Sequence, residues 1–202
     1  MASLARRQLN LLERMAALEP EPFIMGGFAE DALLTGSVTR DHGDVDWILT
    51  RRELKMRRGQ AAALGFDSLE TWGEAAPGEP FYLSGDNGDL RLEAGVADEI
   101  DGRLFFMIHS VAFDIDGEQP RVGYRIRLPD DTFDHAPVEL EGIRIRVASP
   151  LFLYQLRTGI ASQGTFGPLS EHQLETMSQL RARFFPERPE NELEPRVEPL
   201  GS

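Results

Sequence analysis

The chain has 202 residues, of which 41% are hydrophobic and 27% charged, and it contains no cysteine. This composition is ordinary for a globular protein of one domain, or one domain with a small appendage. The lack of cysteine excludes disulfides, thiolate zinc ligands and a cysteine nucleophile. No apolar run approaches about 18 residues, and the N-terminus is typical of an amphipathic helix rather than a secretory signal. We therefore expect a cytoplasmic protein without a membrane span.

The formal net charge is −13, and the Pro/Glu-rich residues 186–202 hold five acids and two arginines, so the rest of the chain carries −10. A general nucleic-acid binder needs a basic footprint, so a nucleic-acid partner is not expected. An acidic cleft would instead speed the arrival of a small cationic substrate. A negative surface that serves solubility alone is the alternative, and the composition does not choose between the two.

Apolar periodicity and turn residues predict the following elements in chain order. Helices are expected over 4–18, 28–34, 51–64, 151–158 and 170–185, and strands over 23–25, 45–49, 66–69, 81–83, 90–96, 104–111, 124–128 and 138–147, with turns at 85–88 and 141–142. This order predicts an α/β protein with a mixed sheet flanked by helices. We expect a main domain over 1–148, a C-terminal helical segment over 149–185, and a disordered tail over 186–202, where apolar residues are too few to order the chain.

Two aspartates, Asp44 and Asp46, lie at the start of the strand predicted over 45–49. Side chains alternate in a strand, so both carboxylates project from one face. At about 4 Å apart they repel by roughly 4 kcal/mol at an effective dielectric of about 20. Mg²⁺ is the natural compensating cation, since it binds one or two carboxylates together with substrate phosphates. A second Asp-x-Asp, Asp114-Ile115-Asp116, directly precedes Gly117 and is interpreted as turn chemistry.

Two adjacent glycines, Gly26 and Gly27, stand between the strand predicted over 23–25 and the next helix. Glycine lets a backbone approach a ligand closely, and the N–H groups of a helix N-terminus favour a phosphate. The glycines and the aspartates together suggest a nucleoside triphosphate site with a metal ion.

The segment that holds both features carries Gly26, Gly27, Phe28, Ala29 and Asp31, then Thr39, Arg40, His42, Asp44, Val45 and Asp46. It resembles the signature of the DNA polymerase β-like nucleotidyltransferase superfamily, and within it the aminoglycoside 2''-adenylyltransferases and lincosamide nucleotidyltransferases. The resemblance implies that fold and a Mg²⁺-dependent transfer of a nucleoside monophosphate, most simply AMP from ATP, to a hydroxyl of a small acceptor. An aminoglycoside acceptor fits the acidic balance best and would make the protein an antibiotic-resistance enzyme.

The same resemblance implies a third carboxylate on a later strand, either as a metal ligand or as the base that activates the acceptor hydroxyl. Glu93 in the run Leu90-Arg91-Leu92-Glu93 matches that context, although the families usually have Asp there, and Asp89 is the reserve candidate. Arg40 and His42 are predicted to bind the nucleotide, with a purely structural role as the alternative for either.

Three residues depart from the family pattern, namely Phe28, Trp47 and His172. Two other functions remain open. A toxin-like transferase that modifies RNA or protein would use a basic groove, for which the cluster at 51–58 is the available candidate. A non-catalytic module that retains the fold would leave Glu93 turned away from the aspartates.

Overall fold

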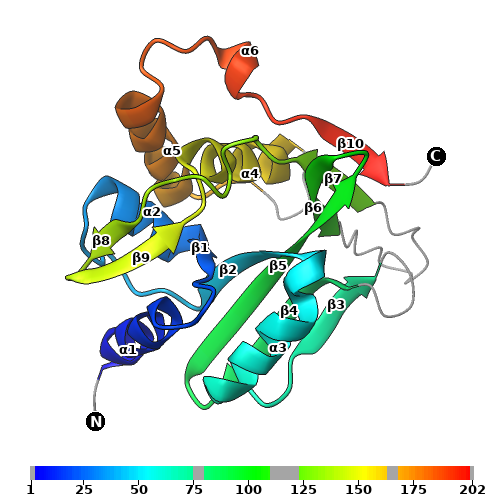
Figure 1. Ribbon diagram of the computed structural model, residues 1–202. Coiled ribbons are helices and arrows are strands. Elements are labelled where there is room, and N and C mark those ends of the chain that lie inside the picture. Colours follow the sequence, from blue (N-terminus) through cyan, green and yellow to red (C-terminus); the bar gives the residue numbers. More distant parts are fainter. Residues whose placement is uncertain (1–2, 75–79, 110–122, 163–167, 201–202) are drawn as a thin grey trace, which may run out of the picture.

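The computed structural model describes residues 3–74, 80–109, 123–162 and 168–200 (Figure 1). The helices are α1 (Leu4–Ala16), α2 (Gly26–Leu34), the 3-10 turn η1 (Arg51–Glu53), α3 (Leu54–Ala63), α4 (Pro150–Ser162), α5 (Glu171–Phe184) and α6 (Glu190–Leu193). The strands are β1 (Phe23–Met25), β2 (Val45–Thr50), β3 (Glu70–Glu74), β4 (Pro80–Asn87), β5 (Leu90–Ile100), β6 (Arg103–His109), β7 (Gly123–Arg127), β8 (Val138–Leu140), β9 (Ile143–Val147) and β10 (Val197–Leu200). The pair Asp114 and Asp116 lies outside the described residues.

The strands form one mixed sheet in the order β10-β7-β6-β5-β2-β1-β9-β8, with β3 and β4 joined through β5. The long strand β5 is parallel to β2 on one side, while on the other it pairs first with β4 and then with β6. β1 lies antiparallel to β2. The prediction of a mixed sheet flanked by helices is confirmed, and this strand order brings the ends of β1, β2 and β5 together.

Helix α2 is the central helix of the layer that covers β1 and β2. Its residues from Phe28 to Leu33 are all buried, because strands β1 and β2 cover one side and helices α4 and α5 the other. In Figure 1, α3 lies in front of the strands around β4, at a distance from α4 and α5. Because α2 is covered on all sides, it does not show the one-sided apolar stripe of a surface helix.

Several element boundaries differ from the sequence-based expectation, most clearly those of β3 and β4. The strand expected over 66–69 begins later, as β3 at Glu70, and β4 continues to Asn87, so that only Gly88 and Asp89 form the hairpin turn. Two-residue turns match the twist of paired strands, which explains why this hairpin is tighter than predicted.

The prediction that the tail is disordered is wrong for residues 186–200. Leu193 on α6 is completely buried, and the hydroxyl of Tyr154 donates a 3.1 Å hydrogen bond to Glu190. β10 pairs antiparallel with β7, with Val197 opposite Ile126. Backbone hydrogen bonds at a sheet edge need few apolar side chains, so composition alone missed this order. The division at residue 148 stays a prediction.

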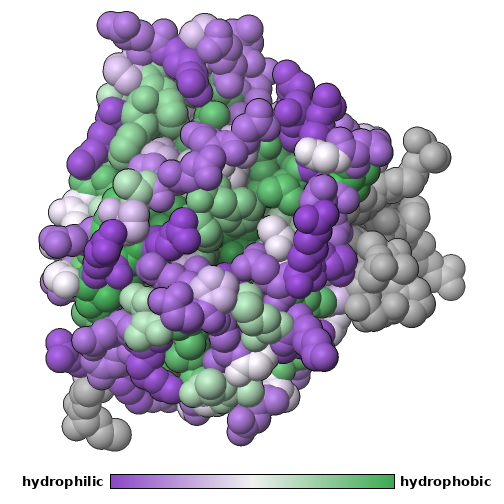
Figure 2. Space-filling view, viewed as in Figure 1, coloured by the Kyte–Doolittle hydropathy of each residue, from purple (hydrophilic) through white to green (hydrophobic). Residues whose placement is uncertain are grey.

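Hydrophilic residues cover most of the face seen in Figure 2, and hydrophobic residues gather in a hollow near its centre. Among the described residues, none of the helices combines the length and the apolar character that crossing a bilayer requires. The cytoplasmic location stays a prediction.

Replacing Leu193 with alanine tests the packing of the C-terminal residues. Because the side chain is fully buried, we expect Leu193→Ala to lower the free energy of unfolding by roughly 2–5 kcal/mol. The control is Leu174→Ala, whose side chain is 53% exposed and whose effect should stay within about 0.5 kcal/mol. Equal effects of the two substitutions in urea unfolding would contradict the packing of α6.

Candidate active site

Three carboxylates meet at one end of the pair β2 and β5. Asp44 directly precedes β2, and Asp46 on β2 stands beside Glu93 on β5 in the parallel register. Neighbouring residues in register share a face of the sheet. One carboxylate oxygen from each of the three lies within 4.8 Å of the others. The structure thus brings together the three predicted metal ligands, with Glu93 turned toward the aspartates.

Burial and neighbouring negative charge act on the two aspartates of the cluster. Burial, followed by the nearby charges of Asp44 and Glu93, raises the pKa of Asp46 well above its usual value. Burial and then Glu93 also raise the pKa of Asp44. A divalent cation would offset this cost, and three carboxylate oxygens are the ligands that Mg²⁺ prefers. The donor set therefore fits the metal ion that the sequence predicts.

The diglycine turn lies directly against Asp46. Gly26 has φ +66°, and a Cβ atom there would stand 2.9 Å from Cγ of Asp46 and closer still to its Oδ2. Only glycine accommodates both the left-handed backbone and this close approach. At Met25, the N-cap of α2, no side chain caps the helix. The N-cap side chain therefore accepts none of the first N–H groups of α2, which lie beside the carboxylates.

The loop between α2 and β2 closes over Gly27. A Cβ atom at Gly27 would lie 2.5 Å from Cε1 of His42 and 2.7 Å from Nη2 of Arg40. Arg40 donates through Nε to Nε2 of His172 on α5, at 2.9 Å. The guanidinium of Arg40 thus stands at the start of α2.

Asp31 braces this loop from inside α2. Its carboxylate accepts hydrogen bonds from the backbone N–H and the hydroxyl of Thr39, and its Oδ2 lies 2.8 Å from Nε2 of His42. Burial by itself would raise the pKa of Asp31, but the bonds from His42 and Thr39 outweigh it and lower the pKa. His42 is buried, and its bond to Asp31 fits the structural role given above as the alternative to nucleotide binding.

Two of the departures from the family pattern are core residues. The ring of Phe28 packs on that of His42 with centroids 4.1 Å apart. Trp47 is fully buried, with the guanidinium of Arg57 at 6.0 Å from its ring.

Tyr82 and Arg91 hold Glu93, and the sequence analysis missed both. The hydroxyl of Tyr82 donates to Oε2 of Glu93 and lies 3.4 Å from Oδ1 of Asp46, while Nε of Arg91 donates to Oε1 of Glu93 at 2.6 Å. Alternation along β5 already places Arg91 and Glu93 on one face, which is a signal that was available. Tyr82 comes from β4 and becomes visible only once the register of the hairpin is known.

Arg157 on α4 is a further cation near the site that the sequence analysis missed. It forms a two-pronged ion pair with Glu30 on α2, at 2.9 and 3.2 Å. Its charge also acts on Asp46 and opposes the rise of that residue's pKa. No periodicity or motif links residues 30 and 157, so a sequence reading has no signal for this pair.

Asp89, the reserve candidate, stands apart from the carboxylates. It lies in the hairpin turn, with its side chain 64% exposed, and forms an ion pair with Arg7. The cluster of possible metal ligands contains Glu93 instead.

The basic cluster at 51–58 is largely engaged in ion pairs. Arg51 pairs with Asp98, Arg52 with Glu99, and the buried Arg57 with Glu53. Paired arginines offer less net positive charge to a nucleic-acid backbone than free ones. The RNA-modifying alternative stays a hypothesis.

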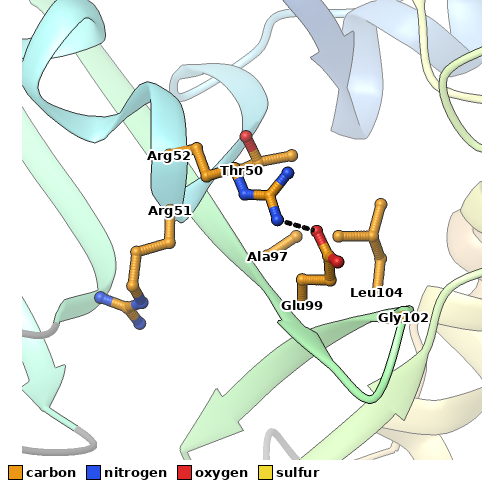
Figure 3. A pocket seen from close by; sticks show the side chains of 7 residues that line it. All are labelled: Thr50, Arg51, Arg52, Ala97, Glu99, Gly102 and Leu104. Atoms are coloured by element: carbon orange, nitrogen blue, oxygen red, sulfur yellow. Dashed lines mark ion pairs between the residues drawn. The ribbon is translucent and has the colours of Figure 1, made fainter.

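Figure 3 shows a pocket at the far end of β2, bordered by Thr50, Arg52 and Glu99. The ion pair between Arg52 and Glu99 crosses it, and Arg51 points away from the other side chains. None of the three clustered carboxylates lines this pocket, so it is separate from the candidate site.

The sequence matches no protein-family model and no curated protein. Solved structures do match. The solution structure of the antibiotic-resistance factor ANT(2'')-Ia has a TM-score of 0.62 at 19% identity, over 90% of this chain and 86% of that one. The crystal structure of ANT(2'')-Ia in complex with adenylyl-2''-tobramycin has a TM-score of 0.61 at 20% identity, over 94% of this chain and 95% of that one. This chain has the nucleotidyltransferase fold. The fold expected from the resemblance is thereby confirmed.

Two glycines with nearly the same backbone angle test the contact between Gly26 and Asp46. Gly88 has φ +64° and open space around its Cβ position, so Gly88→Ala should cost only the left-handed backbone, about 1–2 kcal/mol. Gly26→Ala should cost roughly 1–3 kcal/mol more, because the new methyl group must displace Asp46. Equal losses in denaturant unfolding would refute the close approach.

The brace at Asp31 predicts a pH-dependent loss of stability. Asp31→Asn should destabilise the protein by roughly 2–4 kcal/mol at pH 7, since one amide oxygen cannot replace a carboxylate that accepts three hydrogen bonds. The pKa of Asp31 is lower in the folded protein than its usual value of 3.8. The stability that its carboxylate contributes is therefore complete above pH 3.8 and is lost as the pH falls through the folded-state pKa. The difference between the two proteins should therefore shrink at the acid end of a urea-unfolding series. A difference that grew on acidification would rule the brace out, and the exposed Asp134→Asn serves as the control.

Proposed function

We propose that the protein is a Mg²⁺-dependent nucleotidyltransferase that moves AMP from ATP to a hydroxyl of a small cationic acceptor. One observation carries the proposal: Asp44, Asp46 and Glu93 converge beside Gly26 at the uncapped start of α2, within a nucleotidyltransferase fold. Neither the cluster of carboxylates nor the helix start would suffice alone, because both features are common in proteins of other functions.

The metal ion would be held by Asp44, Asp46 and Glu93. When bound, Mg²⁺ supplies positive charge that offsets the mutual repulsion of the carboxylates and the charge of the phosphates. All three proposed ligands are partly buried, and burial raises the pKa of Asp46 well above its usual value. A shielded ligand makes a stronger electrostatic contribution than one that faces bulk water.

The triphosphate would be seated by the start of α2. Gly26 and Gly27 leave the backbone N–H groups accessible, and Arg40 adds a guanidinium at the same place. Asp31 and His42 support the loop that carries Arg40. These groups would orient the polyphosphate, and positioning together with charge compensation accounts for most of the catalysis in phosphoryl-type transfers.

In the reaction, the acceptor oxygen forms a bond to the α-phosphorus of ATP while the bond from that phosphorus to the bridging oxygen breaks and pyrophosphate leaves. The proton of the attacking hydroxyl passes to a carboxylate of the cluster, for which we propose Glu93. Its two oxygens accept hydrogen bonds from Arg91 and Tyr82, and each oxygen keeps a further lone pair.

The acceptor is proposed to be an aminoglycoside, with a lincosamide as the next candidate. The ANT(2'')-Ia neighbour is complexed with an adenylylated aminoglycoside, adenylyl-2''-tobramycin. The net charge of −13 suits a polycationic sugar. On this proposal the protein confers antibiotic resistance in the cytoplasm.

Pyrophosphate release tests the proposed reaction. Each NTP is incubated with Mg²⁺ and the full chain across a panel of aminoglycosides and lincosamides, and turnover is expected with ATP and an aminoglycoside. Asp46→Asn should reduce the rate at least about a hundredfold, whereas Asp67→Asn at an exposed loop position should not change it. Absence of turnover and of nucleotide binding throughout the panel would overturn the proposal.

A further inference from the structure

We infer that Tyr82 is a positioning residue that holds the carboxylate of Glu93 where the metal site needs it. The inference rests on the proposed metal site and goes beyond it, because Tyr82 belongs to a different strand from every proposed ligand and matches no part of the family signature.

The register of the sheet places Tyr82 diagonally to Glu93. Ser84 on β4 lies directly opposite Glu93, and Tyr82 lies opposite Gly95, so Tyr82 shares the face from which Glu93 projects. Diagonal neighbours on paired strands stand about 7–8 Å apart at the backbone, a distance that a tyrosine spans with its ring. The hydroxyl accordingly reaches Oε2 of Glu93.

A phenol hydroxyl has a single proton to donate. Glu93 is the nearer acceptor, while Oδ1 of Asp46 lies at 3.4 Å, beyond an ordinary O–H···O distance. Tyr82 therefore restrains chiefly Glu93, and its longer contact with Asp46 is the weaker of the two.

Glu93 needs such a restraint because a glutamate side chain is one methylene longer than an aspartate side chain. The extra methylene adds a rotatable bond, and ordering it costs conformational entropy. Tyr82 and Arg91 bind separate oxygens of the carboxylate and so fix its orientation. The residue pair Glu93 and Tyr82 would thus do together what a shorter carboxylate does alone.

Tyr82 should contribute more to this restraint than Arg91. The side chain of Arg91 is 43% exposed and that of Glu93 only 14%. Solvent screens the exposed guanidinium, which weakens its hold. The bond from Tyr82 on the adjoining strand is part-buried, whereas the bond from Arg91 is exposed, so such screening is smaller for Tyr82.

Manganese binding measures the restraint without relying on turnover. The full chain is titrated with MnCl₂ in the presence of a non-hydrolysable ATP analogue, and free Mn²⁺ is followed by electron paramagnetic resonance. Tyr82→Phe keeps the ring and removes the hydroxyl, and we expect about tenfold to a hundredfold weaker Mn²⁺ binding. Tyr154→Phe removes a comparable hydroxyl–carboxylate bond, to Glu190 on α6, and should leave Mn²⁺ affinity unchanged.

A double-mutant cycle separates positioning from a general structural role. Glu93→Asp shortens the carboxylate, so that it no longer reaches Tyr82, and adding Tyr82→Phe in that background should change Mn²⁺ affinity by less than about twofold. The inference would be overturned if Tyr82→Phe weakened Mn²⁺ binding equally in both backgrounds, or if it had no effect in the protein that keeps Glu93. Either result would leave the proposed metal site standing. Failure of the unsubstituted protein to bind Mn²⁺ at all would overturn the proposed metal site and this inference with it.

Discussion

Mutual repulsion among Asp44, Asp46 and Glu93 is the constraint on which the rest of the structure depends. At the 4.8 Å that bounds their separation, two unit charges repel by about 3–4 kcal/mol at an effective dielectric of 20. The sheet nevertheless holds them together, because β2 runs parallel to β5 and sets Asp46 beside Glu93. Arg91 and Arg157 supply positive charge from two sides and Tyr82 supplies a hydrogen bond. These neighbours offset part of the repulsion among the carboxylates. A bound divalent ion would offset the rest.

Polar contacts tie α2 and the loop that follows it to the C-terminal helices. Arg157 on α4 binds Glu30, Arg183 on α5 donates to the carbonyl of Leu34 at 2.6 Å, and Arg40 reaches His172 on α5. Helix α2 is thus fastened along its length to the helices behind it. The segment predicted over 149–185 therefore helps to orient α2, whose start is proposed to bind the phosphates, as well as contributing to the core.

Sequence spacing within single strands and turns predicted the clustered carboxylates and the diglycine turn better than it predicted the side chains that hold them. Asp44, Asp46, Gly26 and Gly27 were recognisable because their spacing within one strand or one turn carries the chemistry. Glu93 followed from alternation along a strand together with the family resemblance. Tyr82 and Arg157 escaped notice because each meets the site through strand register or helix packing, which a linear pattern does not contain. The order of residues 186–200 was missed for a related reason, since β10 depends on the backbone of β7.

The two ends of the main strand order are poor templates for another chain. An unpaired sheet edge invites pairing with a neighbouring molecule, and proteins commonly blunt it with proline, charge or shortness. At one end stands β10, whose Pro199 lacks a backbone donor and whose Glu198 is held by Arg125. At the other end β8 extends over only three residues, Val138–Leu140. The same C-terminal residues that complete the sheet therefore also guard it against edge-to-edge aggregation.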